Sequence, residues 1–225
     1  MVSVMRSASM TERARRARAK RVLPGLRELY PQVDCALDHA DAFQLLAATI
    51  LSAQCTDKTV NTVTPALFRR YPNPAAMARA APAALEKLVY STGFYRNKAK
   101  NLRAMAKTVV EQHGGEVPRT MDELLGLPGV ARKTANVVLG TAWGVAVGIV
   151  VDTHVQRLSQ RLALTEETAP VAIERDLMRI VPQADWIWLA HALIWHGRLV
   201  CDAKRPRCGE CTLARICPAA ATFAA

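Results

Sequence analysis

Apolar residues recur at helical spacing along most of the chain, and proline, glycine and polar capping residues separate the apolar segments. Asp41 precedes the segment 43–54, whose apolar side chains cover almost every side of a helix and so predict a buried one. The segment 97–113 has apolar residues every three or four positions and stops at two glycines. Pro74 and Pro82 each stand where the first turn of a helix is expected.

The second half of the chain continues this pattern. Thr120 begins a capping box, and the helix that follows is expected to end at a tight turn over residues 127–131. Asp152 and Asp185 are expected to begin two more helices. Residues 145–151 are the single candidate strand, because no other segment alternates convincingly between apolar and polar residues. The sequence therefore predicts an all-α fold.

One uncharged segment, residues 134–151, needs a separate interpretation. Its eighteen residues barely reach across a bilayer core, and three glycines interrupt it. We therefore expect a buried helix followed by a turn rather than a membrane span.

The charge of the chain indicates an anionic partner. The 225 residues contain 30 Lys and Arg against 19 Asp and Glu, a formal net charge of +11. Nucleic acid, an anionic membrane surface or a phosphorylated ligand would suit this charge, whereas an aromatic content of 5% argues against a stacking single-strand binder. Residues 1–21 form a basic arm that is interpreted either as a disordered tail or as a DNA contact.

Four of the six cysteines lie close together near the C-terminus, and they are Cys201, Cys208, Cys211 and Cys217. A structural zinc site usually has two Cys-x2-Cys pairs, whereas this spacing has one such pair with wider gaps outside it. The wider gaps favour a [4Fe-4S] cluster, with zinc or free thiols as the alternatives. No apolar segment follows the N-terminal basic residues, so the chain is predicted to be cytoplasmic, with a mitochondrial transit peptide as the alternative.

Two segments are candidates for phosphate binding. The loop between the first two of these cysteines carries Lys204, Arg205 and Arg207, which a bound cluster would hold in place, although a solvated loop is the alternative. The turn before residue 133 would place backbone N–H groups at a helix start, where phosphate binds well. Its residues are Gly129, Val130, Ala131 and Arg132. Taken alone, Asp152 is a helix cap and His154 a polar helix residue.

These features occur in an order that resembles one family. Residues 127–137, then 151–154 about 20 residues later, then the four cysteines are similar to endonuclease III, a member of the helix–hairpin–helix, Gly-Pro-Asp superfamily of DNA glycosylases. Residues 51–57, 92–99 and 196–198 also resemble family segments. The resemblance runs from about residue 22 to residue 217.

The resemblance implies two helical domains with a cleft between them. Residues 35–146 would form a six-helix barrel that contains the helix–hairpin–helix. Residues 1–34 and 147–225 would form the iron–sulfur domain.

The resemblance also implies a bifunctional DNA glycosylase and AP lyase of base excision repair that removes oxidised pyrimidines. Lys133 would attack C1′ of an extruded nucleotide and form a Schiff base, after which β-elimination cleaves the strand. Asp152 would assist proton transfer and stabilise positive charge on the sugar. The expected partner is double-stranded DNA with a damaged base or an abasic site, bound by a monomer at the bacterial nucleoid.

By the same resemblance, Gln54 fills the gap left by the extruded nucleotide and Phe94 wedges into the opposite strand. The resemblance also makes His154 a DNA contact. The sequence departs from the family at Ala131, where a second glycine is usual, and at Phe94, where an aliphatic residue is common.

A monofunctional adenine-mismatch glycosylase and a non-catalytic helix–hairpin–helix protein are the alternatives. Lys133 argues against the adenine-mismatch glycosylase, which usually lacks this lysine. Lys133 and Asp152 together argue against the non-catalytic protein, which has no need of both.

Overall fold

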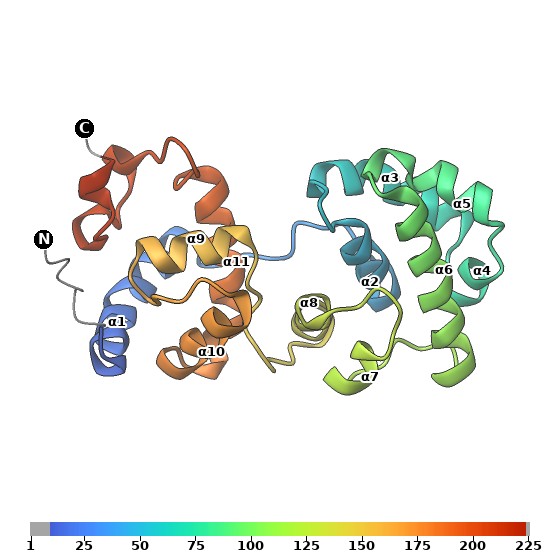
Figure 1. Cartoon of the computed structure of the whole chain (residues 1–225), viewed down its shortest axis with the longest axis horizontal. Helices are drawn as coiled ribbons and strands as arrows, with labels where there is room; N and C mark the ends of the chain where they lie inside the picture. The colour runs from blue at the N-terminus through green and yellow to red at the C-terminus, as the bar shows by residue number, and fades with distance from the viewer. Residues whose placement is uncertain (1–9, 224–225) are drawn as a thin grey trace, which may run out of the picture. The chain divides into compact units, whose positions relative to one another are not determined.

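The computed structural model describes residues 10–223, and these residues form helices joined by short loops (Figure 1). The α-helices are α1 (Glu12–Leu29), α2 (Ala42–Leu51), α3 (Asp57–Arg70), α4 (Pro74–Ala78), α5 (Pro82–Val89), α6 (Tyr95–Gln112), α7 (Met121–Leu125), α8 (Arg132–Trp143), α9 (Thr153–Arg161), α10 (Pro170–Ile180) and α11 (Trp186–Leu199). The described part of the chain contains no strand, residues 145–151 included. The predicted all-α fold is confirmed.

The chain divides into two compact units. The first, here called the hairpin unit, is Cys35–Val147 and contains α2 to α8. The second, here called the cysteine unit, comprises the residues up to Asp34 and those from Gly148 onward, and contains α1 and α9 to α11.

The hairpin unit is built around α2, which contacts α3, α6 and α8. Eight of the ten residues of α2 are buried, as the nearly all-apolar segment predicts. The predicted cap at Asp41 is present, because its side chain accepts a hydrogen bond from the Gln44 N–H (2.8 Å). Pro74 stands in the first turn of α4 as predicted, and Asn73 caps this helix by accepting a hydrogen bond from the Ala76 N–H (2.8 Å). Local cap chemistry therefore sets several helix starts in this unit.

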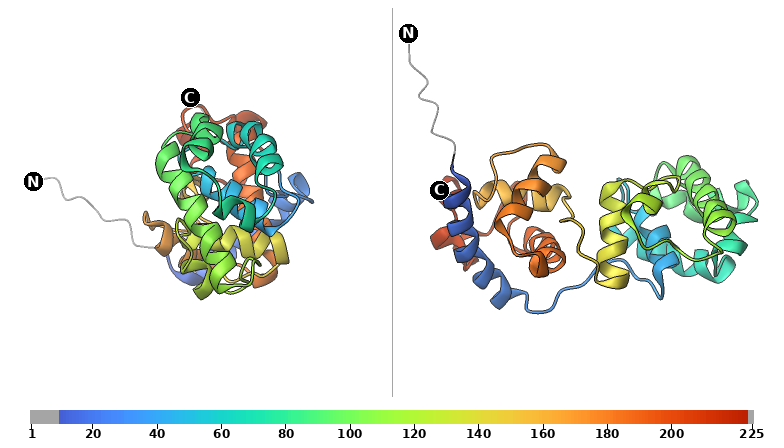
Figure 2. Two further views of the ribbon diagram at one scale, coloured as in Figure 1. Left: turned by 90° about the vertical axis from the view of Figure 1, so that its right-hand side faces the viewer. Right: turned by 90° about the horizontal axis from the view of Figure 1, so that it is seen from below.

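The cysteine unit packs α11 against α1 and α9, with α1 also contacting α10 (Figure 2). Asp185 begins α11 as predicted, but its carboxylate forms no capping hydrogen bond and instead pairs with Arg27 of α1. Two indole N–H groups of α11 hold the segment after α1: Trp188 donates to the Tyr30 carbonyl (2.7 Å) and Trp195 to the Asp34 carbonyl (3.3 Å).

The basic arm is not a tail from Glu12 onward, because this part of it is the first half of α1. Arg15 pairs with Asp176 at 2.9 Å, and both side chains are largely buried. Arg18 donates to the Ile216 carbonyl at 3.0 Å. These cations hold α1 on its unit, so they contribute to the fold as well as to the net charge. The start of the arm, including Arg6, lies outside the described residues.

The uncharged segment 134–151 is divided in the way the sequence predicts. α8 ends at Trp143, and Gly144 takes a left-handed conformation (φ 68°) that ends the helix. No helix in residues 10–223 is long and apolar enough to span a bilayer.

Candidate functional site

The turn between α7 and α8 depends on Gly129. Its φ of 80° favours glycine, and a Cβ there would lie 2.9 Å from the Cβ of Asn101 on α6. Val130 is buried, and its N–H donates to the Leu127 carbonyl at 3.1 Å. Val130 therefore closes the turn with its backbone N–H, and we no longer expect that group to meet a phosphate.

Other groups of this turn are arranged for an anion. The N–H groups of Gly129 and Ala131 have no partner among the described residues. Ala131 is extended, with a φ of −102°, so an alanine fits here without the strain that a left-handed residue would carry. The positive end of the α8 dipole faces the same turn, which favours phosphate. Arg132 and Lys133 follow in the first turn of α8, and both are exposed.

Gln54 and Phe94 share an unusual backbone conformation. They have φ values of 53° and 47°, and they are two of the three non-glycine residues with positive φ in residues 10–223. This conformation costs about 1–2 kcal/mol for an L-residue, and such strain concentrates at functional sites. Both side chains are exposed, Phe94 to 64%. The structure thus presents both candidate DNA contacts on strained, exposed loops of the hairpin unit.

Lys98, to which no motif gives a specific role, holds the loop that contains Phe94. It is 4% exposed, and its ammonium donates to the Thr92 carbonyl at 2.6 Å, next to the loop that contains Phe94. Burial lowers the pKa of Lys98, and nearby Cys55, which follows Gln54, opposes that shift. Its place within the family-like segment 92–99 was the only signal in the sequence.

Asp152 caps α9 with one carboxylate oxygen. Its Oδ1 accepts hydrogen bonds from the His154 N–H (2.9 Å) and the Val155 N–H (2.8 Å), as the sequence predicts. Its Oδ2 has no hydrogen-bond partner within residues 10–223. One oxygen therefore fixes the side chain and the other is available to a ligand.

His154 packs against α11 through Arg157. The Arg157 guanidinium lies 3.2 Å from His154 Nδ1 and donates to the Gly197 and Cys201 carbonyls, each at 3.0 Å. Burial lowers the pKa of His154, and the Asp152 carboxylate opposes the shift, so the ring is neutral near pH 7. The DNA contact expected of His154 stays a prediction, because the structure places its ring against protein groups.

Gly197 allows this close approach of α9 and α11. A Cβ at Gly197 would lie 2.8 Å from His154 Nδ1 and 3.0 Å from Arg157 Nη2. We expect Gly197→Ala to lower stability by about 1–2 kcal/mol, because overpacking outweighs the better helix propensity of alanine. Thermal unfolding checks this, with Gly209→Ala as the control, since no atom lies within 4 Å of a Cβ there. An unchanged melting temperature in Gly197→Ala would contradict the close-packing role.

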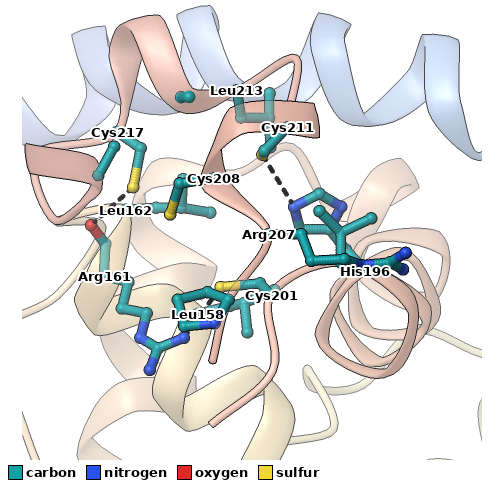
Figure 3. A pocket seen from close by; sticks show the side chains of 14 residues that line it. Leu158, Arg161, Leu162, His196, Cys201, Arg207, Cys208, Cys211, Leu213 and Cys217 are labelled. Carbon is teal, nitrogen blue, oxygen red and sulfur yellow. Dashed lines mark hydrogen bonds between the residues drawn. The ribbon is translucent and has the colours of Figure 1, made fainter. Parts of the chain in front are cut away.

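The four C-terminal cysteines line one cavity, together with apolar side chains that include Leu158, Leu162 and Leu213 (Figure 3). No three ligating side chains in residues 10–223 are grouped around a position for one metal ion. A zinc ion would need its sulfurs about 2.3 Å away, whereas the four irons of a [4Fe-4S] cluster each take a separate thiolate. The donor set and its wide arrangement therefore fit a cluster better than zinc.

Arg161 and His196 contact the cysteines, and of these two only His196 lies in a family-like segment of the sequence. Arg161 of α9 donates to Cys201 Sγ at 3.2 Å, and it also donates to the Asp202 and Ala203 carbonyls at 2.7 Å each. His196 Nε2 lies 3.4 Å from Cys211 Sγ. Burial lowers the pKa of His196 to about 4, so the ring is neutral and carries one N–H. The Tyr30 hydroxyl, 3.1 Å from Nδ1, can donate there and leave the Nε2–H for the sulfur.

The loop between Cys201 and Cys208, residues 202–207, is here called the basic loop, and its fold depends on its own aspartate. Asp202 Oδ1 accepts from the N–H groups of Lys204 (2.9 Å) and Arg205 (3.2 Å), and these bonds lower the pKa of Asp202. The side chains of Lys204 and Arg205 are exposed and have no ion pair among the described residues. Arg207 instead pairs with Glu210 at 3.4 Å. Lys204 and Arg205 are thus the cations of this loop that are free for phosphate.

Comparisons with known proteins agree on one protein family for the two units. A sequence model described as "HhH-GPD superfamily base excision DNA repair protein" matches residues 47–183. Endonuclease III of Synechocystis sp. is 56% identical over 207 residues, which cover 92% of this chain and 94% of that protein. Endonuclease III of Bacillus subtilis is 47% identical, covering 84% of this chain and 87% of that protein. A solved non-covalent endonuclease III–DNA complex superposes with a TM-score of 0.88 at 40% identity, over 95% of this chain and 98% of that one.

Proposed function

The chain belongs to the endonuclease III family of the HhH-GPD superfamily, and we propose that Lys133 and Asp152 carry out its chemistry. It is a bifunctional DNA glycosylase and AP lyase that removes oxidised pyrimidines. The observation that carries the residue assignment is the position of Lys133. It is an exposed amine in the first turn of α8, two residues after the unpartnered N–H of Ala131. A sugar whose phosphate binds this turn comes within reach of that amine.

The proposed reaction starts from a nucleotide extruded from the duplex, because C1′ is inaccessible within the stack. The neutral amine of Lys133 forms a bond to C1′ while the bond from C1′ to the base breaks, and the base leaves with that electron pair. Opening of the sugar ring then gives an imine, and the ring oxygen takes a proton. Loss of a proton from C2′ expels the 3′ phosphate by β-elimination, which cuts the strand.

Asp152 has two compatible parts in this scheme. Its capped Oδ1 fixes the side chain, whereas Oδ2 assists proton transfer and stabilises positive charge on the sugar. A lysine is needed as the nucleophile because water or a serine hydroxyl could displace the base but could not form an imine.

The DNA contacts follow from the exposed groups of each unit. In the proposal the hairpin N–H groups of Gly129 and Ala131 and the side chain of Arg132 bind phosphates, and Lys204 and Arg205 bind others. Gln54 and Phe94 occupy the stack at the extruded nucleotide. The partner is double-stranded DNA with a damaged base or an abasic site, bound by one copy of the chain. The relatives named above are bacterial, so the proposed setting is the bacterial chromosome.

Cys201, Cys208, Cys211 and Cys217 would hold the [4Fe-4S] cluster of the family. Cys201 and Cys208 flank the basic loop, so as cluster ligands they would fix both of its ends. Arg161 and His196 donate to two of the ligand sulfurs, and Arg161 also ties the start of the loop to α9.

Borohydride trapping tests the proposed function. We expect the wild-type chain to form a covalent adduct with duplex DNA that contains thymine glycol or an abasic site, because borohydride reduces the imine to a stable amine. Without borohydride, the damaged strand should be cut by β-elimination. Undamaged duplex is the control and should give neither product. Base release without an adduct would instead indicate a monofunctional glycosylase, and no reaction with either lesion would overturn the proposal.

A further inference from the structure

One side of α6 carries a row of cations that neither the hairpin turn nor the basic loop uses. The row consists of Arg96, Lys100, Arg103 and Lys107. Spacings of four, three and four residues place these side chains on the same face of a helix. Together with Pro82 and Glu86 of α5, they line a groove of about 570 Å³ in the hairpin unit. α5 and α6 lie side by side there (Figure 1).

The charge of this groove is not balanced within the described structure. All four cations are exposed, and Glu86 is the single carboxylate among the lining residues. Lys100 and Arg103 have no ion pair within residues 10–223. Lys107 pairs weakly with Glu111, at 3.7 Å on the surface. Like charges three or four residues apart destabilise a helix, so this face favours a bound anion.

The position and length of the row point to one kind of anion. Arg96 lies two residues after Phe94, the exposed residue proposed to wedge into the strand opposite the lesion. From Arg96 to Lys107 the helix rises about 16 Å, which matches about five base pairs at about 3.4 Å each. Guanidinium and ammonium groups bind phosphates, and the groove has no aromatic lining on which bases could stack.

We propose that this α5–α6 groove binds the phosphodiester backbone of duplex DNA beside the lesion, on the side toward which α6 runs from Phe94. The site rests on the proposed function, since the lesion at Phe94 sets the register of the duplex. The groove extends the DNA contact beyond the residues that act on the damaged nucleotide. It contributes affinity and salt dependence but reads no base.

A paired-charge experiment tests the groove. The Lys100→Ala/Arg103→Ala variant removes its two unpaired cations, and Arg69→Ala/Arg70→Ala is the matched control, with two exposed cations at the end of α3 in the same unit. Binding is measured to two duplexes with a tetrahydrofuran abasic analogue. One duplex has about twelve base pairs on the 5′ side of the lesion and about three on the 3′ side, and the other has the reverse arrangement. The groove lies on one side of the lesion, so only one of the two duplexes reaches it.

For the duplex that reaches the groove, the double variant should bind about tenfold more weakly near 0.1 M salt, and the slope of log K against log[salt] should decrease by about 2. The other duplex and the control variant should show wild-type affinity. An equal loss of affinity for both duplexes, or the same loss in the control variant, would indicate a general charge effect and overturn the proposal. Unchanged affinity of the double variant for the duplex that reaches the groove would overturn it as well. If the groove bound an acidic protein instead of DNA, the double variant would bind both duplexes with wild-type affinity, and the proposal would be overturned.

Two further measurements keep the outcomes distinct. Thermal unfolding of the double variant should match the wild type or exceed it, since like charges are removed from an exposed helix face. The borohydride adduct of the wild-type chain reports the proposed function independently. A wild-type adduct without a loss in the double variant therefore overturns the groove alone, whereas no adduct overturns the function.

Discussion

Lys133→Gln is expected to form no borohydride-trapped adduct, and strand cleavage at an abasic site should fall about a thousandfold or more. The glutamine amide has nearly the reach of lysine, but its nitrogen lone pair is delocalised and cannot form an imine with C1′. Single-turnover cleavage of duplex DNA with one abasic site measures the rate, and denaturing gel electrophoresis after borohydride treatment detects the adduct. An undiminished adduct in Lys133→Gln would contradict the assignment of the nucleophile.

Arg132→Gln is the matched control for this experiment. Arg132 precedes Lys133 in the same turn of α8, is also exposed, and loses the same charge in the substitution. We expect Arg132→Gln to weaken DNA binding severalfold through a lost phosphate contact, yet still to form the adduct at saturating enzyme. If both variants lost the adduct equally, the defect would lie in the charge or fold of the hairpin rather than in the chemistry of the lysine.

Lys133→Gln should still bind DNA, because the hairpin holds phosphate through backbone groups. The N–H groups of Gly129 and Ala131 do not depend on the side chain at position 133. Fluorescence anisotropy with a tetrahydrofuran analogue should show a dissociation constant within about tenfold of the wild type, the cost of one lost cation. Binding and chemistry are thereby separated in one variant.

The sequence predicts helix caps most accurately, because in a cap a side chain bonds to a backbone N–H only a few residues away. The caps at Asp41, Thr120 and Asp152 are all present, and each bonds to an N–H two or three residues away. Such bonds depend on residue type and spacing alone, so a sequence contains all the information needed to predict them. The sequence predicts that α6 begins at residue 97, two residues after its actual start at Tyr95, because Phe94 ends the preceding loop in a left-handed conformation that no residue type predicts.

The long-range contacts could not be predicted in the same way. Arg15 and Asp176 are 161 residues apart, and Arg161 and Cys201 are 40 apart. Charge pattern alone cannot distinguish an arginine that holds a helix from one that contacts solvent or DNA. It therefore does not reveal that Arg15 and Arg18 of the basic arm hold α1 on its unit. Val130 shows the same limit on a small scale, since only the turn geometry reveals that its N–H is already used.

Asp152→Asn separates the structural role of this residue from its chemical one. Asparagine caps a helix as well as aspartate does, so its amide oxygen can keep the bonds from the His154 and Val155 N–H groups. We therefore expect a melting temperature close to that of the wild type. Base release from thymine glycol should fall about a hundredfold to ten-thousandfold, because the amide can neither accept the proton nor stabilise the cationic sugar.

Asp152→Ala provides the comparison that makes this test decisive. Alanine loses the cap as well as the charge, so stability should fall by about 1 kcal/mol, a decrease in melting temperature of about 2–4 °C. Its rate of base release should be no higher than that of Asp152→Asn. If Asp152→Asn kept the wild-type rate while Asp152→Ala lost it, the carboxylate would be a cap and nothing more. A low rate in both, with stability lost only in Asp152→Ala, assigns the chemistry to the oxygen that the cap leaves free.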